Sequence, residues 1–269
     1  MSSVYRSEHA PRYHNEPHIR ALTWNRESIG YLLSKKLERL TPELFMTPTG
    51  GRRTIQDWLG AEWLHNVERG EIEEITDYLL RHTRLIPRDI VSLGNDLCNE
   101  VLVHKRRERA DVPEEAIRRV VSQAACRFGN AQLRQCANQV SADTMPERAA
   151  DHGYSHVYTT ENGYSAGVER DIRDLIRMIG VDRFDNATLH VLRFCANERF
   201  NNATDLPSVL WQNGLLGYED GEGVRFYSLS DLGDFTLPDD VESYVFHPIV
   251  IDSARIKGLG PVVRPHFRD

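Results

Sequence analysis

Apolar residues recur at helical spacing along most of this chain. The first such stripe consists of Ile29, Leu32, Leu33, Leu37 and Leu40. Residues three or four positions apart share one face of an α-helix, so this stripe predicts an amphipathic helix with one buried face. Asn25 stands where it can cap the helix, and Trp24 stands where it can pack back onto Ile29. We therefore expect the first helix to begin after Asn25.

The helical pattern continues beyond this stripe. Trp58 and Trp63 each precede a leucine, which predicts a second helical region, and Gly70 separates that region from the next helix. Pro87 and Pro113 each suit the first turn of a further helix, where the missing proline N–H would have no intrahelical partner in any case. We expect these helices to form a bundle.

The pattern changes towards the C-terminus. The stretch 141–167 is polar and contains Gly and Pro, as linkers do. Helical stripes then return, and after them two aromatic-rich runs flank the Glu-Asp-Gly-Glu-Gly sequence at 219–223, which indicates a β-hairpin. The alternating, β-branched stretch 243–251 predicts another strand. Helices followed by a small hairpin are the element order of a winged-helix module.

Together these patterns predict a mainly α-helical fold with a small antiparallel β-hairpin or sheet. A chain of 269 residues is long enough for one large domain or for two to three small ones. We divide it into four segments: an irregular segment 1–22, a helical domain 23–140, a linker 141–167 and a winged-helix domain 168–269.

Composition narrows the class of protein. Hydrophobic residues make up 40% of the chain and charged residues 27%, as in globular proteins. The 33 Lys and Arg against 40 Asp and Glu give a net charge of -7, which argues against a generally basic nucleic-acid coat. No apolar run reaches the roughly 18 residues of a membrane span, and the N-terminus does not resemble a signal peptide. The 4 cysteines form no CxxC pair and fit a reducing compartment. We expect a cytoplasmic protein with no membrane partner.

Motifs for a self-contained active site are missing from the sequence. The chain contains no GxxxxGK[ST] phosphate-binding loop, no HExxH and no GxSxG. His9, His14 and His18 lie close in sequence, but no cysteine or carboxylate frame accompanies them, so we expect no metal site. The chain alone is therefore not expected to be an enzyme.

Three segments, in this order and spacing, resemble one protein family. They are IRALTWNRESIGYLLSKKLERL at 19–40, RHTRLIPRDIVSLGN at 81–95 and LPSVLWQNGLLGY at 206–218. They are similar to the part of bacterial P-loop ATPases of the AAA+/STAND, origin-recognition type that follows the nucleotide-binding core, namely a helical lid and a winged helix. PRDIV is the most specific element, and His82-Thr83 departs from the Arg-Thr that the family often has.

The resemblance implies a site for nucleotide phosphates. The ATPase core either precedes this segment or has been lost, and it would bind ATP and Mg²⁺ in the complete ATPase, with no cofactor expected for this chain alone. In such lids an arginine in the position of Arg88 serves as a second sensor of the phosphates, and Arg84 and Arg6 are weaker candidates. A cation at a helix N-terminus is poorly placed unless an anion shares the site. The alternative is that Arg88 faces solvent or pairs with Asp89 or Asp96.

The resemblance also implies partners and a role. ATPases of this type commonly self-assemble, so we expect a homo-oligomer, with the ATPase core and a protein effector as further partners. ATP would set the angle of the lid, and the winged helix would pass that change on. Bacterial settings such as defence against mobile DNA fit the family.

The distribution of basic residues bears on direct nucleic-acid binding. Residues 180–269 hold 8 Lys and Arg against 14 Asp and Glu, which disfavours contacts with phosphates. The better candidates lie in two basic runs elsewhere and are Lys35, Lys36, Lys105, Arg106 and Arg107; the hairpin adds only Arg225, which stands beside acidic residues. A solvated helix face explains the same runs. Two alternative functions stay open: a stand-alone winged-helix DNA-binding regulator, and a metal-dependent hydrolase or nuclease that uses scattered carboxylates.

Overall fold

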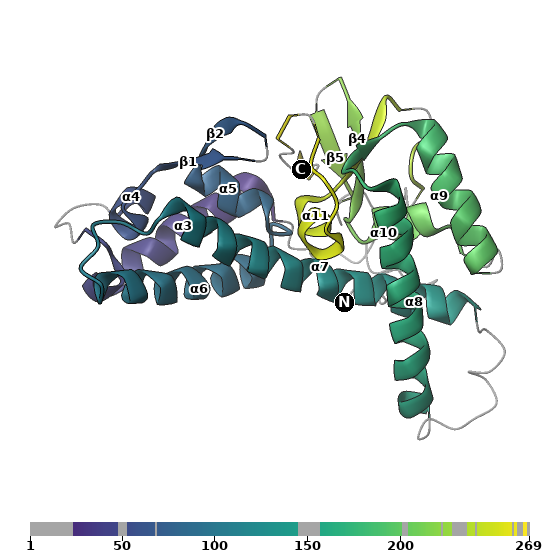
Figure 1. Cartoon of the computed structure of the whole chain (residues 1–269), viewed down its shortest axis with the longest axis horizontal. Helices are drawn as coiled ribbons and strands as arrows, with labels where there is room; N and C mark the ends of the chain where they lie inside the picture. Colours follow the sequence, from purple (N-terminus) through teal and green to yellow (C-terminus); the bar gives the residue numbers. More distant parts are fainter. Residues whose placement is uncertain are drawn as a thin grey trace, which may run out of the picture.

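A computed structural model of the chain describes residues 24–47, 53–67, 69–144, 157–200, 204–221, 223–227, 236–239, 241–259, 261–262 and 266–267 (Figure 1). The predicted irregular segment 1–22 lies outside them. The first half consists of α3 (Arg26–Arg39), η1 (Pro42–Leu44), α4 (Ile55–Leu59), β1 (Trp63–Asn66), β2 (Glu71–Glu74), α5 (Ile75–Arg81), α6 (Pro87–Lys105) and α7 (Glu114–Thr144).

The predicted start of the first helix is confirmed. Asn25 caps α3: its side chain accepts the Ser28 N–H at 2.8 Å, and the Ser28 hydroxyl in turn accepts the Asn25 N–H at 3.0 Å. This reciprocal pair satisfies two backbone donors that a helix start would otherwise leave open. The stripe that begins at Ile29 is buried against the rest of the bundle, as its period indicates.

The segment after α4 forms a β-hairpin. β1 and β2 pair antiparallel, with Leu64 opposite Glu73. Burial alternates along β1, since Leu64 is 1% exposed and Trp63 is 54% exposed, which is the period of a strand with one covered face. Gly70 lies in the hairpin turn at φ 67° and donates its N–H to the Asn66 carbonyl at 2.8 Å. The prediction of a helical region through Trp63 is therefore wrong, because two adjacent apolar residues do not define a period.

Helix α7 connects the two halves of the molecule (Figure 1). Helix α6 packs against its first part, and α8, α10 and α11 pack against its second part. One hydrophobic cluster contains buried residues from Ile29 in α3 to Ile256 after α11, so the two predicted domains share a continuous core. Both ends of the predicted linker 141–167 are helical, because α7 extends to Thr144 and α8 begins at Val157.

The second half combines helices with a small sheet. Its elements are α8 (Val157–Ile179), β3 (Arg183–Phe184), α9 (Asn186–Arg199), α10 (Leu206–Gln212), β4 (Leu216–Asp220), β5 (Gly223–Phe226), β6 (Ser243–Phe246), α11 (Pro248–Ala254) and β7 (His266–Phe267). The strand order is β3-β6-β4-β5-β7, antiparallel except for the parallel pair β5-β7. Along the chain, the elements from α8 to β5 follow the order of a winged helix. Across the sheet, β6 lies between β3 and β4.

Gly129 lets α11 approach α7 closely. A β-carbon at this position would lie 2.4 Å from the Ile249 carbonyl oxygen, so only glycine fits without displacement. On the other side of α11, Arg173 and Arg177 of α8 donate hydrogen bonds to its last carbonyls, at 2.6 Å and 3.0 Å. Cations are favourable there because those carbonyls lack intrahelical partners. Helix α11 is thus fixed between α7 and α8.

The predicted fold class is confirmed: the chain is mainly helical, with a small antiparallel sheet and a β-hairpin. The cysteines at 98, 126, 136 and 195 are free thiols, and Cys136 is fully buried. Among the described helices, none combines the length and the apolar character that crossing a membrane requires.

Candidate functional site

Arg84, one of the candidates for nucleotide binding, is held by contacts within the chain. Its Nε and Nη2 donate to the two carboxylate oxygens of Asp89, at 2.7 Å and 2.8 Å, and its Nη1 donates to Gln132 Oε1 at 2.6 Å. Asp89 is fully buried and also accepts the Arg84 backbone N–H at 3.3 Å. Such a bidentate, charge-assisted pair fixes both partners. Arg84 therefore ties the start of α6 to α7.

Arg88 has a different environment, although it lies only four residues further along. It is exposed in the first turn of α6, and the described residues offer it no hydrogen bond or ion pair. The two carboxylates that could have paired with it are engaged elsewhere, Asp89 with Arg84 and Asp96 with Arg127. The Arg88 guanidinium consequently faces solvent at the positive end of a helix, where an anion would be favourable.

The other sequence candidates are not gathered into one site. Arg6 lies outside the described residues. Lys35 pairs with Glu38 at 2.8 Å, and Lys105 donates to the Glu43 carbonyl at 3.2 Å. The remaining candidates of the two basic runs, Lys36, Arg106 and Arg107, are exposed. Arg225 pairs with Asp220 at 2.5 Å within the hairpin. The structure thus leaves exposed basic side chains on α3 and at the end of α6, whereas Arg225 is engaged within the β4–β5 hairpin.

Helix α10 occupies the place of the DNA-reading helix in a winged-helix order. Most of its side chains are buried: Leu206, Pro207, Val209, Leu210 and Trp211. Gln139 of α7 covers its end, donating to Gln212 Oε1 at 3.2 Å and accepting from Asn213 Nδ2 at 3.3 Å. Five of the seven residues of α10 are thus held in the core, and the end of the helix is bound to α7.

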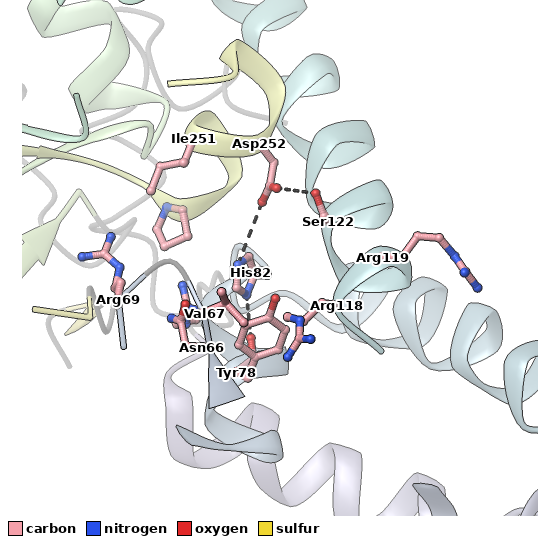
Figure 2. Close-up of a pocket in the computed structure, with 12 residues that line it drawn as sticks. Asn66, Val67, Arg69, Tyr78, His82, Arg118, Arg119, Ser122, Ile251 and Asp252 are labelled. Carbon is pink, nitrogen blue, oxygen red and sulfur yellow. Dashed lines mark hydrogen bonds and ion pairs between the residues drawn. The ribbon is translucent and has the colours of Figure 1, made fainter. Parts of the chain in front are cut away.

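A pocket of about 320 Å³ lies where the first half meets α11 (Figure 2). It is lined by Asn66, Val67 and Arg69 of the hairpin turn, Tyr78, Arg81 and His82 of α5 and its end, Arg118, Arg119 and Ser122 of α7, and Pro248, Ile251 and Asp252 of α11. Four segments from both halves of the sequence therefore build one site. We call it the junction pocket.

His82 is buried at the end of α5 with its Nε2 toward Asp252 (Figure 2). Its Nδ1 lies 2.7 Å from the Tyr78 carbonyl oxygen. A carbonyl only accepts hydrogen bonds, so Nδ1 carries the ring proton. Burial, and next the charge of Arg81, hold the pKa of His82 well below its usual value. The ring is therefore neutral at pH 7, and Nε2 is a hydrogen-bond acceptor.

Asp252 faces His82 from α11. Its Oδ2 lies 3.9 Å from His82 Nε2, and its Oδ1 accepts the hydroxyl of Ser122 at 2.5 Å. The Ser122 hydroxyl donates its proton to Asp252 and not to His82. Ser122, His82 and Asp252 therefore lack the serine-to-histidine hydrogen bond that activates the nucleophile of a serine hydrolase. His82 Nε2 lies instead on the side of Asp252 Oδ2.

The four arginines of the junction pocket are each paired with a carboxylate. The pairs are Arg69–Asp182 at 2.6 Å, Arg81–Glu73 at 2.9 Å, Arg118–Glu114 at 2.9 Å and Arg119–Glu100 at 2.5 Å. Arg69 also donates to the Leu259 and Pro261 carbonyls, so the hairpin turn is tied to the C-terminal segment. The charges of these arginines are compensated, and the pocket is not an open basic cleft.

His247 is the N-cap residue of α11 and directly precedes Pro248 of the pocket lining. It is fully buried, and its Nδ1 accepts the Ile249 N–H at 3.3 Å, capping the helix. Burial first, and the charge of Arg84 second, lower the pKa of His247 to about 3. Protonation would place a charge in the core and remove the cap, so the fold requires the neutral ring.

Sequence reasoning missed the junction pocket. His82 stood out only as a departure from the family motif. Ser122 lies within a predicted helix but is not one of its apolar positions, and Asp252 directly follows the predicted strand 243–251. Residues 248–254 in fact form α11, so the prediction of a strand through 251 is correct only as far as Phe246. Among the described residues, no group of three or more His, Cys, Asp or Glu is placed to hold a metal ion.

No protein-family model, curated protein or solved structure matches this chain. The fold defines the class of this protein, which is a helical bundle joined through one long helix to a winged-helix-like unit. The bundle carries an exposed arginine at a helix start, and a polar pocket lies between the two parts.

Proposed function

We propose that this chain is the helical lid and regulatory part of a P-loop ATPase of the AAA+/STAND type, and that it passes the nucleotide state of an ATPase core to a partner. One observation carries the proposal: Arg88 is an exposed arginine without a partner among the described residues, at the start of α6. Its neighbour Arg84 is fully engaged, which leaves Arg88 as the side chain able to reach a phosphate.

The packing supports a relay from Arg88 to the winged-helix-like unit. Asp89 holds Arg84, Arg84 holds Gln132 of α7, and Gln132 donates to Asn213 Oδ1 at the end of α10 (3.4 Å). A displacement of the first turn of α6 is thus transmitted through side-chain contacts to α10. A two-state hinge biased by phosphate contacts needs a connection of this kind.

The proposal includes the partners of the complete ATPase. ATP and Mg²⁺ would be bound mainly by the ATPase core, with Arg88 contributing from the lid side. Self-assembly, a protein effector and a setting such as defence against mobile DNA belong to the same proposal, on the strength of the family resemblance. DNA reading through α10 is not part of it, because that helix is packed against α7.

The first experiment measures ATP binding and phosphate release by the chain alone, in the presence of Mg²⁺. We expect neither, since Arg88 is a single phosphate contact. Turnover by the chain alone would contradict the proposal, because it would require an active site within these residues.

The second experiment uses the complex with the ATPase core, isolated with the tagged chain in the presence of a non-hydrolysable ATP analogue. We expect Arg88→Ala to weaken binding of a fluorescent ATP analogue about 10-fold, as the loss of a charge-assisted contact does. Arg106→Ala is the matched control, since Arg106 is exposed at the other end of α6. Equal affinities of the two variants, with unchanged melting curves, would refute the sensor role.

A further inference from the structure

The backbone groups of the β1–β2 hairpin point alternately inward and outward. In an antiparallel pair, every second residue directs its N–H and C=O toward the partner strand and the residues between direct theirs away. Ile75 donates its N–H to the Glu62 carbonyl at 2.8 Å, so these two residues face inward. Counting along the register from this pair, His65 and Ile72, which lie opposite each other, direct their backbone groups outward.

The β1 edge of the hairpin is covered, whereas the β2 edge is open. Glu114 of α7 accepts the His65 N–H at 3.0 Å, and Arg118 of α7 donates to the His65 carbonyl at 2.7 Å. On the other edge the sheet has no third strand, and no described residue bonds the outward N–H and C=O of Ile72. Open strand edges pair readily with extended segments. The β2 edge can therefore accept a further strand.

Apolar side chains lie on the outer face of this hairpin, at the surface of the bundle (Figure 1). Ile72 is 72% exposed and Trp63 is 54% exposed. Their opposite partners, His65 and Glu74, are two residues from them in the register, so both apolar side chains stand on the same face. A strand added beside β2 would cover Ile72 and remove apolar surface from water.

Carboxylates surround the open edge. Glu71 of β2 and Glu62 before β1 are exposed, and Glu74 of β2 is half-buried. Among the described residues, no cation pairs with these three side chains, whereas the buried Glu73 is paired with Arg81 at 2.9 Å. A segment with Lys or Arg opposite Glu71 and Glu74 would therefore gain two cross-strand pairs of opposite charge.

A second copy of the chain fits this edge less well than a basic segment does. Only outward residues can pair across the edge, so self-pairing would place Ile72 opposite either Ile72 or Glu74 of the other copy. Either register brings the carboxylates of two acidic edges together, and like charges at such distances are destabilising.

We propose that the open edge of β2 binds an extended basic segment of a partner protein, which adds to the hairpin as a third strand. The segment runs antiparallel to β2, with an apolar residue opposite Ile72 and Lys or Arg opposite Glu71 and Glu74. Backbone hydrogen bonds to Ile72 supply affinity, and the two charge pairs fix the register. The edge belongs to this chain alone, so the proposal does not rest on an ATPase core.

Fluorescence anisotropy of the full chain with a labelled peptide, Gly-Ser-Lys-Thr-Val-Lys-Ser-Gly, tests the proposal. We expect saturable binding, and at least about 10-fold weaker binding of the same peptide N-methylated at valine, because the methyl group removes the N–H that meets the Ile72 carbonyl. A peptide with glutamate in place of both lysines should bind more weakly still. No binding of the lysine peptide, or equal binding of the three peptides, would overturn the proposal.

Two variants locate the site. Glu71→Lys should weaken binding of the lysine peptide at least about 3-fold, and Glu198→Lys is the matched control, since it makes the same charge change at an exposed position of α9. Ile72→Pro removes the outward N–H at an edge position where proline is tolerated, and should weaken binding further. Unchanged affinity in Glu71→Lys would overturn the proposal even if Ile72→Pro does not fold.

Sedimentation of the chain with and without the lysine peptide tests the other occupant. We expect the peptide to leave the oligomeric state unchanged. A dimer that the peptide dissociates would mean that a second copy occupies the edge, and would overturn the proposal.

Discussion

Acidification between pH 6.5 and 5 will destabilise this protein through His247. The ring is fully buried and caps α11 as an acceptor, and its pKa in the folded state is about 3. In the unfolded chain a histidine has a pKa of about 6.5. Below pH 6.5 the unfolded state therefore binds a proton that the folded state does not bind, so the free energy of unfolding falls with pH.

The magnitude follows from the size of this pKa difference. Between the two pKa values one such group removes about 1.4 kcal/mol of stability per pH unit. From pH 6.5 to 5 the loss from His247 is thus about 2 kcal/mol. The loss continues until the pH approaches the folded-state pKa of about 3. His82 adds to the loss with the same sign, because its pKa is also lowered by burial.

Urea unfolding at several pH values between 7.5 and 5 measures the effect. With a slope of about 2 kcal/mol per molar urea, a loss of about 2 kcal/mol moves the midpoint by about 1 M. His247→Asn is the informative variant, because asparagine can cap α11 and does not titrate. Its stability should fall with pH less steeply, by about 1.4 kcal/mol per pH unit. Wild type and variant losing equal stability between pH 6.5 and 5 would refute the reasoning.

Two further predictions concern the packing of α7 and the ion pair at the start of α6. Gly129→Ala should cost about 1–3 kcal/mol in urea unfolding, because the new β-carbon meets the Ile249 carbonyl at 2.4 Å. Gly94→Ala, with no atom within 4 Å of the new methyl group, should instead stabilise α6 by up to about 1 kcal/mol, and the same sign for both would be inconsistent with the packing. Asp89→Ala should cost about 3–5 kcal/mol in the same assay, since it leaves Arg84 partly buried without its carboxylate, and a cost below about 1 kcal/mol would show that the pair is not structural.

Much of the helical architecture could be predicted from local sequence. The stripe from Ile29 to Leu37 and the cap at Asn25 act within a few residues, so the chain itself contains the information. The hairpin at Trp63 could not be recognised in the same way. Its burial pattern depends on the pairing of β1 with β2, and on α7, where Glu114 accepts the His65 N–H at 3.0 Å.

The sites depend on contacts between distant residues, which explains why they were less predictable. Arg84 and Arg88 look equally available in the sequence. The difference arises from Asp89, which binds Arg84 through both carboxylate oxygens, and from Gln132, which lies 48 positions along the chain from Arg84. In the junction pocket His82 at the end of α5 lies beside Asp252 of α11, and no local pattern of the sequence predicts that proximity.

The contacts of α7 with α11 and with the end of α10 differ in how easily they separate. Its contact with α11 is close-packed at Gly129, where even a methyl group does not fit. Its contact with the end of α10 is made by amide side chains, Gln139 with Gln212 and Asn213, at 3.2 Å and 3.3 Å. Water can replace such hydrogen bonds at a net cost of about 0.5–1.5 kcal/mol each. The amide contacts at the end of α10 are therefore the part of the α7 surface that yields most easily to a change at the start of α6, whereas the apolar side chains of α10 stay packed in the shared core.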